Sequence, residues 1–341
     1  LYNSDPATSV TSGPYKLVQW ERGGQIQLVA NPTHWRGKPP YQRIVIRHFE
    51  DPASQLLSLR RGDIDAAFNL LPEQIVTLKN DKEVWLREEN SLDFVYMALA
   101  QNAEMNKALA IQEARQAIAY AIDYDGIIRN LLGGAAVRPV SFIPAGLLGS
   151  TEKLTKEIGF REDLGRAKQL LQKAGLADGF EFECSYGNGS IFGTSYHVLG
   201  QKIQADLARV GIKMSLAPMP QVNLRTLYNG GKVPATIVYW NPPAVENALW
   251  SWATVQRVAK RLHWKPPEDL VKLVDDAATE PDQKKAERLY VEYQKRIIAA
   301  FRGASGSTIS MKSWALAPCC PVTRSTRPSA ETMLTPSAMW L

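Results

Sequence analysis

Side chains able to perform catalysis are scattered along this sequence. No H-E-x-x-H, G-x-S-x-G or phosphate-loop pattern occurs in it. Asp63 and Asp65 stand two residues apart, but carboxylates at a helix-to-strand turn cap backbone N–H groups more often than they transfer protons. The four histidines are far apart: His34, His48, His197 and His263. We therefore expect no enzyme active site.

The cysteines predict neither a metal centre nor a disulfide framework. Cys184 falls in a predicted strand and is interpreted as a buried, small apolar side chain. Cys319 and Cys320 are adjacent, which suits neither an ordinary structural disulfide nor the spacing of zinc ligands. We expect no metal ion and no other cofactor.

The positive charge does not predict a nucleic-acid partner. The formal net charge is +6, and residues 302–341 carry +3 of it. A nucleic-acid-binding protein usually concentrates its excess charge on one face, whereas Arg60 and Arg61 are followed here by two aspartates. No run of 18 or more apolar residues occurs, so we expect no membrane-spanning helix.

The first hundred residues predict strands and then a strand–helix alternation. Apolar periodicity and turn residues give this order: strands at 15–21, 26–31 and 42–50, a helix from Pro52 to Gly62, a strand at 64–69 and a helix from Pro72. Such an alternation is typical of βαβ units, so a mostly parallel sheet is expected here.

The next two hundred residues predict a second α/β region. Gln112 to Ile122 reads as an amphipathic helix whose buried face is mostly alanine, and Asp123 is placed to cap a second short helix. Helices and strands then alternate: a strand at 94–101, helices near 164–174, 199–210 and 222–228, strands at 180–186, 212–217 and 235–240, and two charged helices between 269 and 300.

Several spaced segments resemble one known family. They are SGPYKLVQWERGGQIQLVANPTHWRGKPP, RRGDIDAAF, RQAIAYAIDYDGIIRNLLGG, IQADLARVGIKMSL and EPDQKKAERLYVEYQKRI, in that order. Together they resemble the peptide- and nickel-binding family of extracytoplasmic solute receptors (family 5, dipeptide- and oligopeptide-binding type), which serve ATP-driven importers. The likeness runs from about residue 13 to about residue 300.

The resemblance implies a two-lobed α/β fold of the periplasmic-binding-protein type (type II). We expect residues 1–100 to form the later part of the first lobe and residues 101–301 to form the second lobe. The first lobe is expected to be incomplete, with its earlier part preceding Leu1. Residues 302–341 show no sustained period, and we interpret them as an out-of-frame or disordered tail.

The resemblance also places a solute site at the end of the strand that reaches Trp240. The family lines its interlobe cleft with a tryptophan at this point and pairs backbone with an extended peptide. Tyr239, Trp240, Asn241 and Glu246 are therefore candidate binding residues. The alternative is that both aromatic rings simply pack the two faces of a strand.

Three polar side chains at predicted strand ends are further candidates: Gln101, Asn102 and Asn69. Each could donate hydrogen bonds to a solute, and each could equally be an ordinary cap or loop residue. Arg257 and Arg261 lie among tryptophans after the candidate loop, where they could also cover a surface helix.

One departure from the family concerns charge. Peptide-binding members tend to carry acidic residues just after the tryptophan, one of which pairs with the α-amino group of the peptide. Here Asn241 to Val245 contain no acid, and the first carboxylate belongs to Glu246. A modified peptide, an opine-like compound or another polar solute is therefore an open alternative.

The resemblance predicts a function in solute capture without chemistry. We expect a periplasmic, monomeric receptor that binds a peptide or peptide-like solute by lobe closure and delivers it to a membrane permease. Two alternatives stay open: a receptor of this fold for a metal chelate, sugar or other non-peptide solute, and a sensor or chaperone-like module without a transporter.

Overall fold

The structure is a computed structural model that describes residues 12–68, 70–86, 92, 94–134, 136–191, 194–240, 246–302, 312–316 and 322–324. The chain divides into two compact units. Unit 1 comprises Leu1–Ala67, Asn80–Leu86 and Val322–Leu341, and unit 2 comprises Phe68–Lys79 and Arg87–Pro321. The lobe boundary expected between residues 100 and 101 stays a prediction.

The described residues of unit 1 form two small antiparallel sheets. The first has the order β1-β2-β3, and the second has the order β4-β14-β5. Their bounds, with those of the helix between them, are β1 Tyr15–Trp20, β2 Gln25–Ala30, β3 Arg43–Arg47, α1 Pro52–Arg61, β4 Ala66–Ala67, β5 Val84–Leu86 and β14 Val322–Arg324.

The mostly parallel sheet predicted for this region is wrong. Within the described residues, β3 pairs with β2 alone, antiparallel, and β4 and β5 each pair antiparallel with β14. β4 and β5 do run in the same direction, but β14, which comes from much later in the sequence, lies between them. Strand partners so distant in sequence leave no local signal, which is why the alternation was misleading.

The local prediction for α1 is confirmed. The Asp51 side chain accepts a hydrogen bond from the Ser54 backbone N–H at 2.8 Å, as an N-cap residue does. Pro52 occupies the first turn, and Gly62 ends the helix with a left-handed backbone (φ 78°).

Unit 2 is built on a six-stranded mixed sheet with the order β11-β8-β12-β6-β13-β7. Its strands are β6 Phe94–Leu99, β7 Ala136–Val137, β8 Glu181–Gly187, β11 Lys213–Met219, β12 Ala235–Trp240 and β13 Lys312–Leu316, and a separate hairpin comprises β9 Ser190–Ile191 and β10 Thr194–Ser195. β13 and β14 come from the expected tail, whose other residues from 303 onward lie outside the described ones, so the tail hypothesis stays a prediction.

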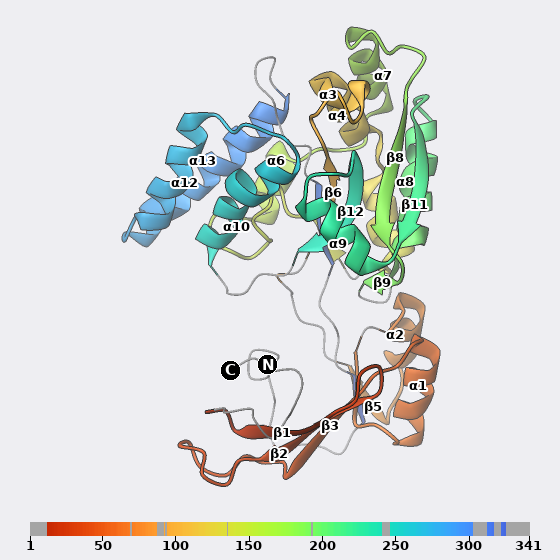
Figure 1. Cartoon of the computed structure of the whole chain (residues 1–341), viewed down its shortest axis with the longest axis vertical. Helices are drawn as coiled ribbons and strands as arrows, with labels where there is room; N and C mark the ends of the chain where they lie inside the picture. Colours follow the sequence, from red (N-terminus) through yellow and green to blue (C-terminus); the bar gives the residue numbers. More distant parts are fainter. Residues whose placement is uncertain are drawn as a thin grey trace. The chain divides into compact units, whose positions relative to one another are not determined.

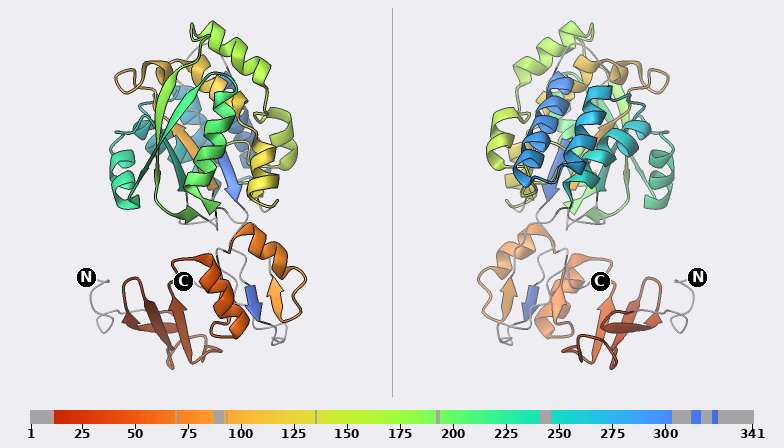
Figure 2. Two further views of the ribbon diagram at one scale, coloured as in Figure 1. Left: turned by 90° about the vertical axis from the view of Figure 1, so that its right-hand side faces the viewer. Right: turned by 90° about the vertical axis from the view of Figure 1, so that its left-hand side faces the viewer.

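Helices cover both faces of this sheet. Figure 2 shows α8 in front of the sheet in one view and α12 and α13 in front of it in the opposite view. The helices of unit 2 (Figure 1) are α2 Pro72–Leu78, α3 Lys107–Ala110, α4 Gln112–Ala121, α5 Tyr124–Gly126, α6 Glu152–Ile158, α7 Leu164–Lys173, α8 Tyr196–Ala208, α9 Gln221–Asn229, α10 Asn247–Ala253, α11 Ala259–Arg261, α12 Glu268–Thr279 and α13 Gln283–Arg302, with π-helical turns η2 Ile127–Leu131 and η3 Thr254–Val258.

The alanine-lined face predicted for the helix at 112–122 is confirmed. Ala114, Ala117, Ile118, Ala121 and Ile122 are all fully buried. Small side chains allow close packing of helices, and α4 packs against α7. The stretch is therefore part of the core of unit 2.

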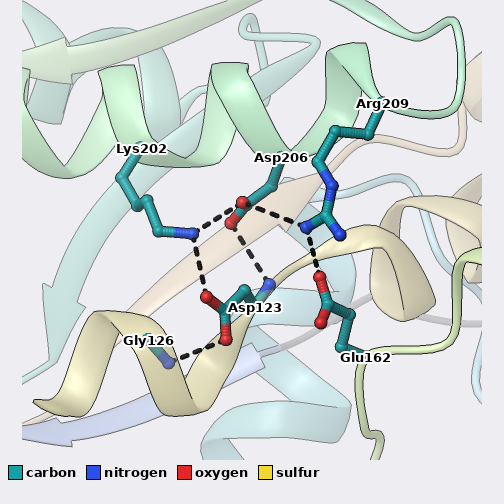
Figure 3. Close-up of polar contacts among 6 residues, drawn as sticks. All are labelled: Asp123, Gly126, Glu162, Lys202, Asp206 and Arg209. Carbon is teal, nitrogen blue, oxygen red and sulfur yellow. Dashed lines mark hydrogen bonds and ion pairs between the residues drawn. The ribbon is translucent and has the colours of Figure 1, made fainter. Parts of the chain in front are cut away.

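A polar cluster joins the start of α5 to α8 (Figure 3). Lys202 Nζ lies 2.6 Å from Asp206 Oδ1 and 3.3 Å from Asp123 Oδ2. Asp206 Oδ2 also accepts a hydrogen bond from the Asp123 backbone N–H at 3.2 Å, while Asp123 Oδ1 accepts one from Gly126 N–H at 2.7 Å, so the predicted cap is confirmed. Asp206 is only 3% exposed, and Arg209 forms ion pairs with both Asp206 and Glu162.

This cluster predicts a pH dependence of stability. Partial burial works to raise the pKa of Asp123, but the Gly126 hydrogen bond and the Lys202 charge outweigh it, so the pKa is lowered. A lowered carboxyl pKa stabilises the folded state above the unfolded pKa of about 3.9, and that contribution is lost as the pH falls through the folded pKa.

Asp123→Asn keeps a capping side chain but removes the charge. Urea midpoints measured from about pH 6 to about pH 3 should therefore fall less steeply for the variant than for the parent protein. Lys202→Met should flatten the profile in the same way. Parallel profiles for all three proteins would show that the pairing contributes nothing.

Candidate functional site

The candidate site lies at the carboxyl ends of β8 and β12. These strands are parallel, with Thr236 opposite Ser185 and Ile237 opposite Tyr186. Solutes bind at such edges in α/β proteins because loops and helix starts converge there. Tyr239 and Trp240 are the last residues of β12, and their side chains point to opposite faces of the sheet.

Trp240 is half-buried and rests on a buried aromatic cluster. Its ring meets that of Phe142 edge-on, with 5.6 Å between the centroids. The centroid of the Phe142 ring lies 4.9 Å from that of Tyr96 and 6.4 Å from that of Trp250. A half-buried ring that rests on an aromatic cluster fits both interpretations of Trp240, as packing residue and as solute contact.

Tyr239 lies on the other face and is 43% exposed. The neighbouring Tyr196 opens α8, and burial together with the nearby Tyr239 raises its pKa. The hydroxyls of Tyr196 and Thr194 are buried, and neither has a hydrogen-bond partner within the described part of the chain. Two unsatisfied hydroxyls at the start of a helix are groups that a polar solute or water would satisfy.

Tyr186 and His197 complete this edge. The Tyr186 hydroxyl lies 2.6 Å from His197 Nδ1, and the His197 N–H donates to Ser195 Oγ at 3.1 Å. None of these residues was a candidate from the sequence. The available signal was Gly187 to Gly189 followed by a capping serine, a turn that delivers a helix start to the end of β8.

Gln101 and Asn102 are not brought together with Trp240. β6 runs antiparallel to β12, with Leu99 opposite Ala235 and Phe94 opposite Trp240. Five residue steps separate Leu99 from Phe94, which corresponds to about 17 Å of strand. The two candidates therefore lie beyond the opposite edge of the sheet, because the carboxyl ends of antiparallel strands point apart.

At that opposite edge, Gln101 and Asn102 each make a hydrogen bond to a nearby backbone group. The Gln101 backbone N–H donates to Leu262 O at 2.9 Å, and Asn102 Oδ1 accepts from Glu104 N–H at 2.9 Å. The side-chain amide of Gln101 is buried and has no partner within the described ranges. Their binding role stays a prediction.

The remaining candidates are Glu246, Asn241 and Asn69. Glu246 is exposed and occupies the N-cap position of α10 without a side-chain capping bond. Burial chiefly raises the pKa of Tyr290, and the charge of Glu246 adds to that rise. Asn241 and Asn69 lie outside the described residues.

Within the described ranges, no group of three or more His, Cys, Asp or Glu side chains is arranged to hold a metal ion. Cys184 is buried as expected, and burial raises the pKa of its thiol. None of the helices in the described ranges is long and apolar enough to cross a membrane.

Comparison with known proteins identifies the class first. The fold is that of two-lobed periplasmic binding proteins: 92% of the chain superimposes on 58% of a DppA from Helicobacter pylori in complex with the peptide STSA, with a TM-score of 0.76 and 21% identity. It superimposes likewise on 62% of AgaA from A. tumefaciens R10 in complex with agropinic acid, with a TM-score of 0.74 and 19% identity.

The sequence then gives the family. Residues 2–259 match the model of bacterial extracellular solute-binding proteins, family 5 Middle, so the chain belongs to this family. The chain is 26% identical over 84% of its length to a probable D,D-dipeptide-binding periplasmic protein of Escherichia coli, of which it covers 54%. It spans about half the length of the curated relatives it matches. The family and the extracytoplasmic location predicted from the sequence are confirmed.

Proposed function

We propose that this protein is the substrate-binding component of an ABC importer and captures a peptide or peptide-like solute. The observation that carries the proposal is the edge formed by β8, β12 and the start of α8, in a chain of the solute-binding family. Exposed aromatic surface and unsatisfied hydroxyls meet there. Rings and a few placed polar groups are what a small-solute site requires.

The names of similar proteins support a peptide-like solute. One relative is named for D,D-dipeptides, and one structural neighbour holds the peptide STSA. The partners in this proposal are the solute and a membrane permease, and the receptor acts as a monomer without nucleic acid. No chemical step on the solute is included, because the family binds solutes.

A non-peptide solute is the second candidate. The observation that favours it is the absence of a carboxylate among the five residues after Trp240, since a peptide amine would have no partner there. One structural neighbour is a complex with agropinic acid. Both candidates share the same site and differ only in the solute.

Mass spectrometry of what co-purifies with the receptor, expressed from its intact gene, tests the proposal. We expect a stoichiometric peptide or peptide-like compound that rebinds in a calorimetric titration. Release of a chemically altered compound over time would instead indicate an enzyme. A receptor that retains neither a peptide nor a peptide-like compound would contradict the proposed solute class.

Trp240→Ala should weaken binding of the recovered compound by about tenfold or more, because a central aromatic contact is typically worth at least 1.4 kcal/mol. Trp240→Phe keeps an aromatic ring and should lose less. Titration calorimetry measures binding, and thermal unfolding of the same samples separates it from stability. A lower melting temperature with unchanged affinity would show that Trp240 only packs the sheet.

A further inference from the structure

Arg261 reaches the candidate site from a distant part of the sequence. It is the last residue of α11, and its side chain is half-buried. The guanidinium carbon lies 5.7 Å from the centroid of the Trp240 ring and 5.0 Å from that of the Tyr228 ring. The cation therefore lies against two aromatic rings, one of them the proposed solute contact.

Behind the guanidinium lies a buried pair of tyrosines. The hydroxyls of Tyr96 and Tyr228 are 2.9 Å apart. Burial raises the pKa of both, and the charge and hydrogen bonding of Arg261 oppose that rise. The Arg261 charge therefore lies close to both phenol groups.

Arg261 is not among the arginines that pair with a carboxylate in the described part of the chain. Arg296 lies 3.1 Å from Asp269 Oδ2 and 2.8 Å from Glu292 Oε1, whereas Arg261 makes no ion pair with any residue that the structure describes. The sequence also offers no acid between Trp240 and Glu246. Arg257 and Lys260, on the same helical stretch, add positive charge.

A half-buried guanidinium without an anion is a costly arrangement, because burial removes water from a charged group. Its planar set of N–H donors matches a carboxylate, which would satisfy it with two parallel hydrogen bonds. The tyrosines supply only neutral oxygens. The N–H donors of Arg261, next to the proposed solute contact, are therefore suited to an anion from outside the chain.

We propose that Arg261 and the ring of Trp240 form a binding position for a carboxylate of the solute. The solute then presents an acid, and not a free amine, to Trp240. This inference rests on the proposed function and specifies the charge that the solute carries at that site.

The test uses a mixed tripeptide library in three forms: unmodified, amidated at the carboxyl end, and acetylated at the amino end. Equilibrium dialysis with the receptor, followed by mass spectrometry, measures retention of each form. We expect amidation to reduce retention about tenfold or more, as for loss of a charge-assisted hydrogen bond, and acetylation to have little effect.

Arg261→Met keeps the length of the side chain and removes its charge, so it should abolish the preference for the acid over the amide. Arg261→Lys keeps the charge without the planar donors and should retain part of it. Arg257→Met is the matched control, because the substitution removes the same charge from the preceding helical turn. Arg257 lies 5.3 Å from the ring of exposed Trp252 and not on Trp240. It should leave the preference unchanged.

The results separate failure of the carboxylate position from failure of the proposed function. Equal retention of acids and amides, or a preference that survives in Arg261→Met, overturns the carboxylate position but leaves the proposed function standing. Stronger loss on acetylation than on amidation would mean that the amine faces the receptor. Retention of none of the three libraries contradicts the peptide receptor and this inference together.

Discussion

Trp250→Ala is expected to destabilise unit 2 by about 3–5 kcal/mol, the usual cost of removing a large buried aromatic side chain. Trp250 is fully buried, and its ring contacts Phe142, which supports Trp240. The cavity left behind cannot close without moving that support. Urea denaturation followed by circular dichroism measures the loss as a lower midpoint with an unchanged slope.

Trp252→Ala is the matched control on the same helix. Its side chain is 41% exposed, and its described partner is Arg257, a cation–π contact at the surface. We expect a cost below about 1 kcal/mol. Similar midpoints for the two variants would contradict the packing assigned to Trp250 and remove the explanation of how Trp240 is held.

Local signals predicted the elements whose causes are local. The cap at Asp51, the glycine end at Gly62 and the alanine face of the helix at 112–121 each depend on residues within one or two turns. Such features follow from backbone hydrogen bonding and side-chain size. The family could be recognised for the same reason, because its segments are short and contiguous.

Long-range pairing could not be predicted in this way. Nothing near β4 or β5 shows that β14 lies between them, and nothing near Gln101 shows that β6 runs antiparallel to β12. Gln101 and Asn102 were candidates because they follow a predicted strand, and candidates at several strand ends form one site only if those ends meet at one edge. That holds only for parallel strands.

The residues of the candidate site also divide into those with a local sequence signal and those brought in by long-range contacts. Trp240 was a candidate because the family resemblance places a cleft tryptophan at the end of its strand, whereas Tyr196 and Arg261 reach that edge from helices elsewhere in the chain. In the sequence, Arg257 and Arg261 were indistinguishable as possible surface residues. The structure separates them, since Arg257 lies on exposed Trp252 and Arg261 lies on Trp240 and Tyr228.

Gly179→Ala should be the second strongly destabilising change, through the loops that begin β8 and β11. Gly179 has a left-handed backbone (φ 86°), and a Cβ there would lie 1.9 Å from the carbonyl oxygen of Gly211. Next to this contact, Lys213 N–H donates to Phe180 O at 2.8 Å as the two strands enter their parallel register. Separating the loops should disturb that register.

Gly175→Ala isolates the backbone contribution. Gly175 also has a positive φ (70°), but a Cβ there would meet nothing within 4 Å. We expect about 1–2 kcal/mol for Gly175→Ala from backbone strain alone, and about 1–3 kcal/mol more for Gly179→Ala from the collision. Denaturant midpoints measured side by side give the difference. Equal losses of stability for the two variants would mean that the loops before β8 and β11 can separate without cost, so that the close approach of Gly179 to Gly211 does not stabilise the sheet.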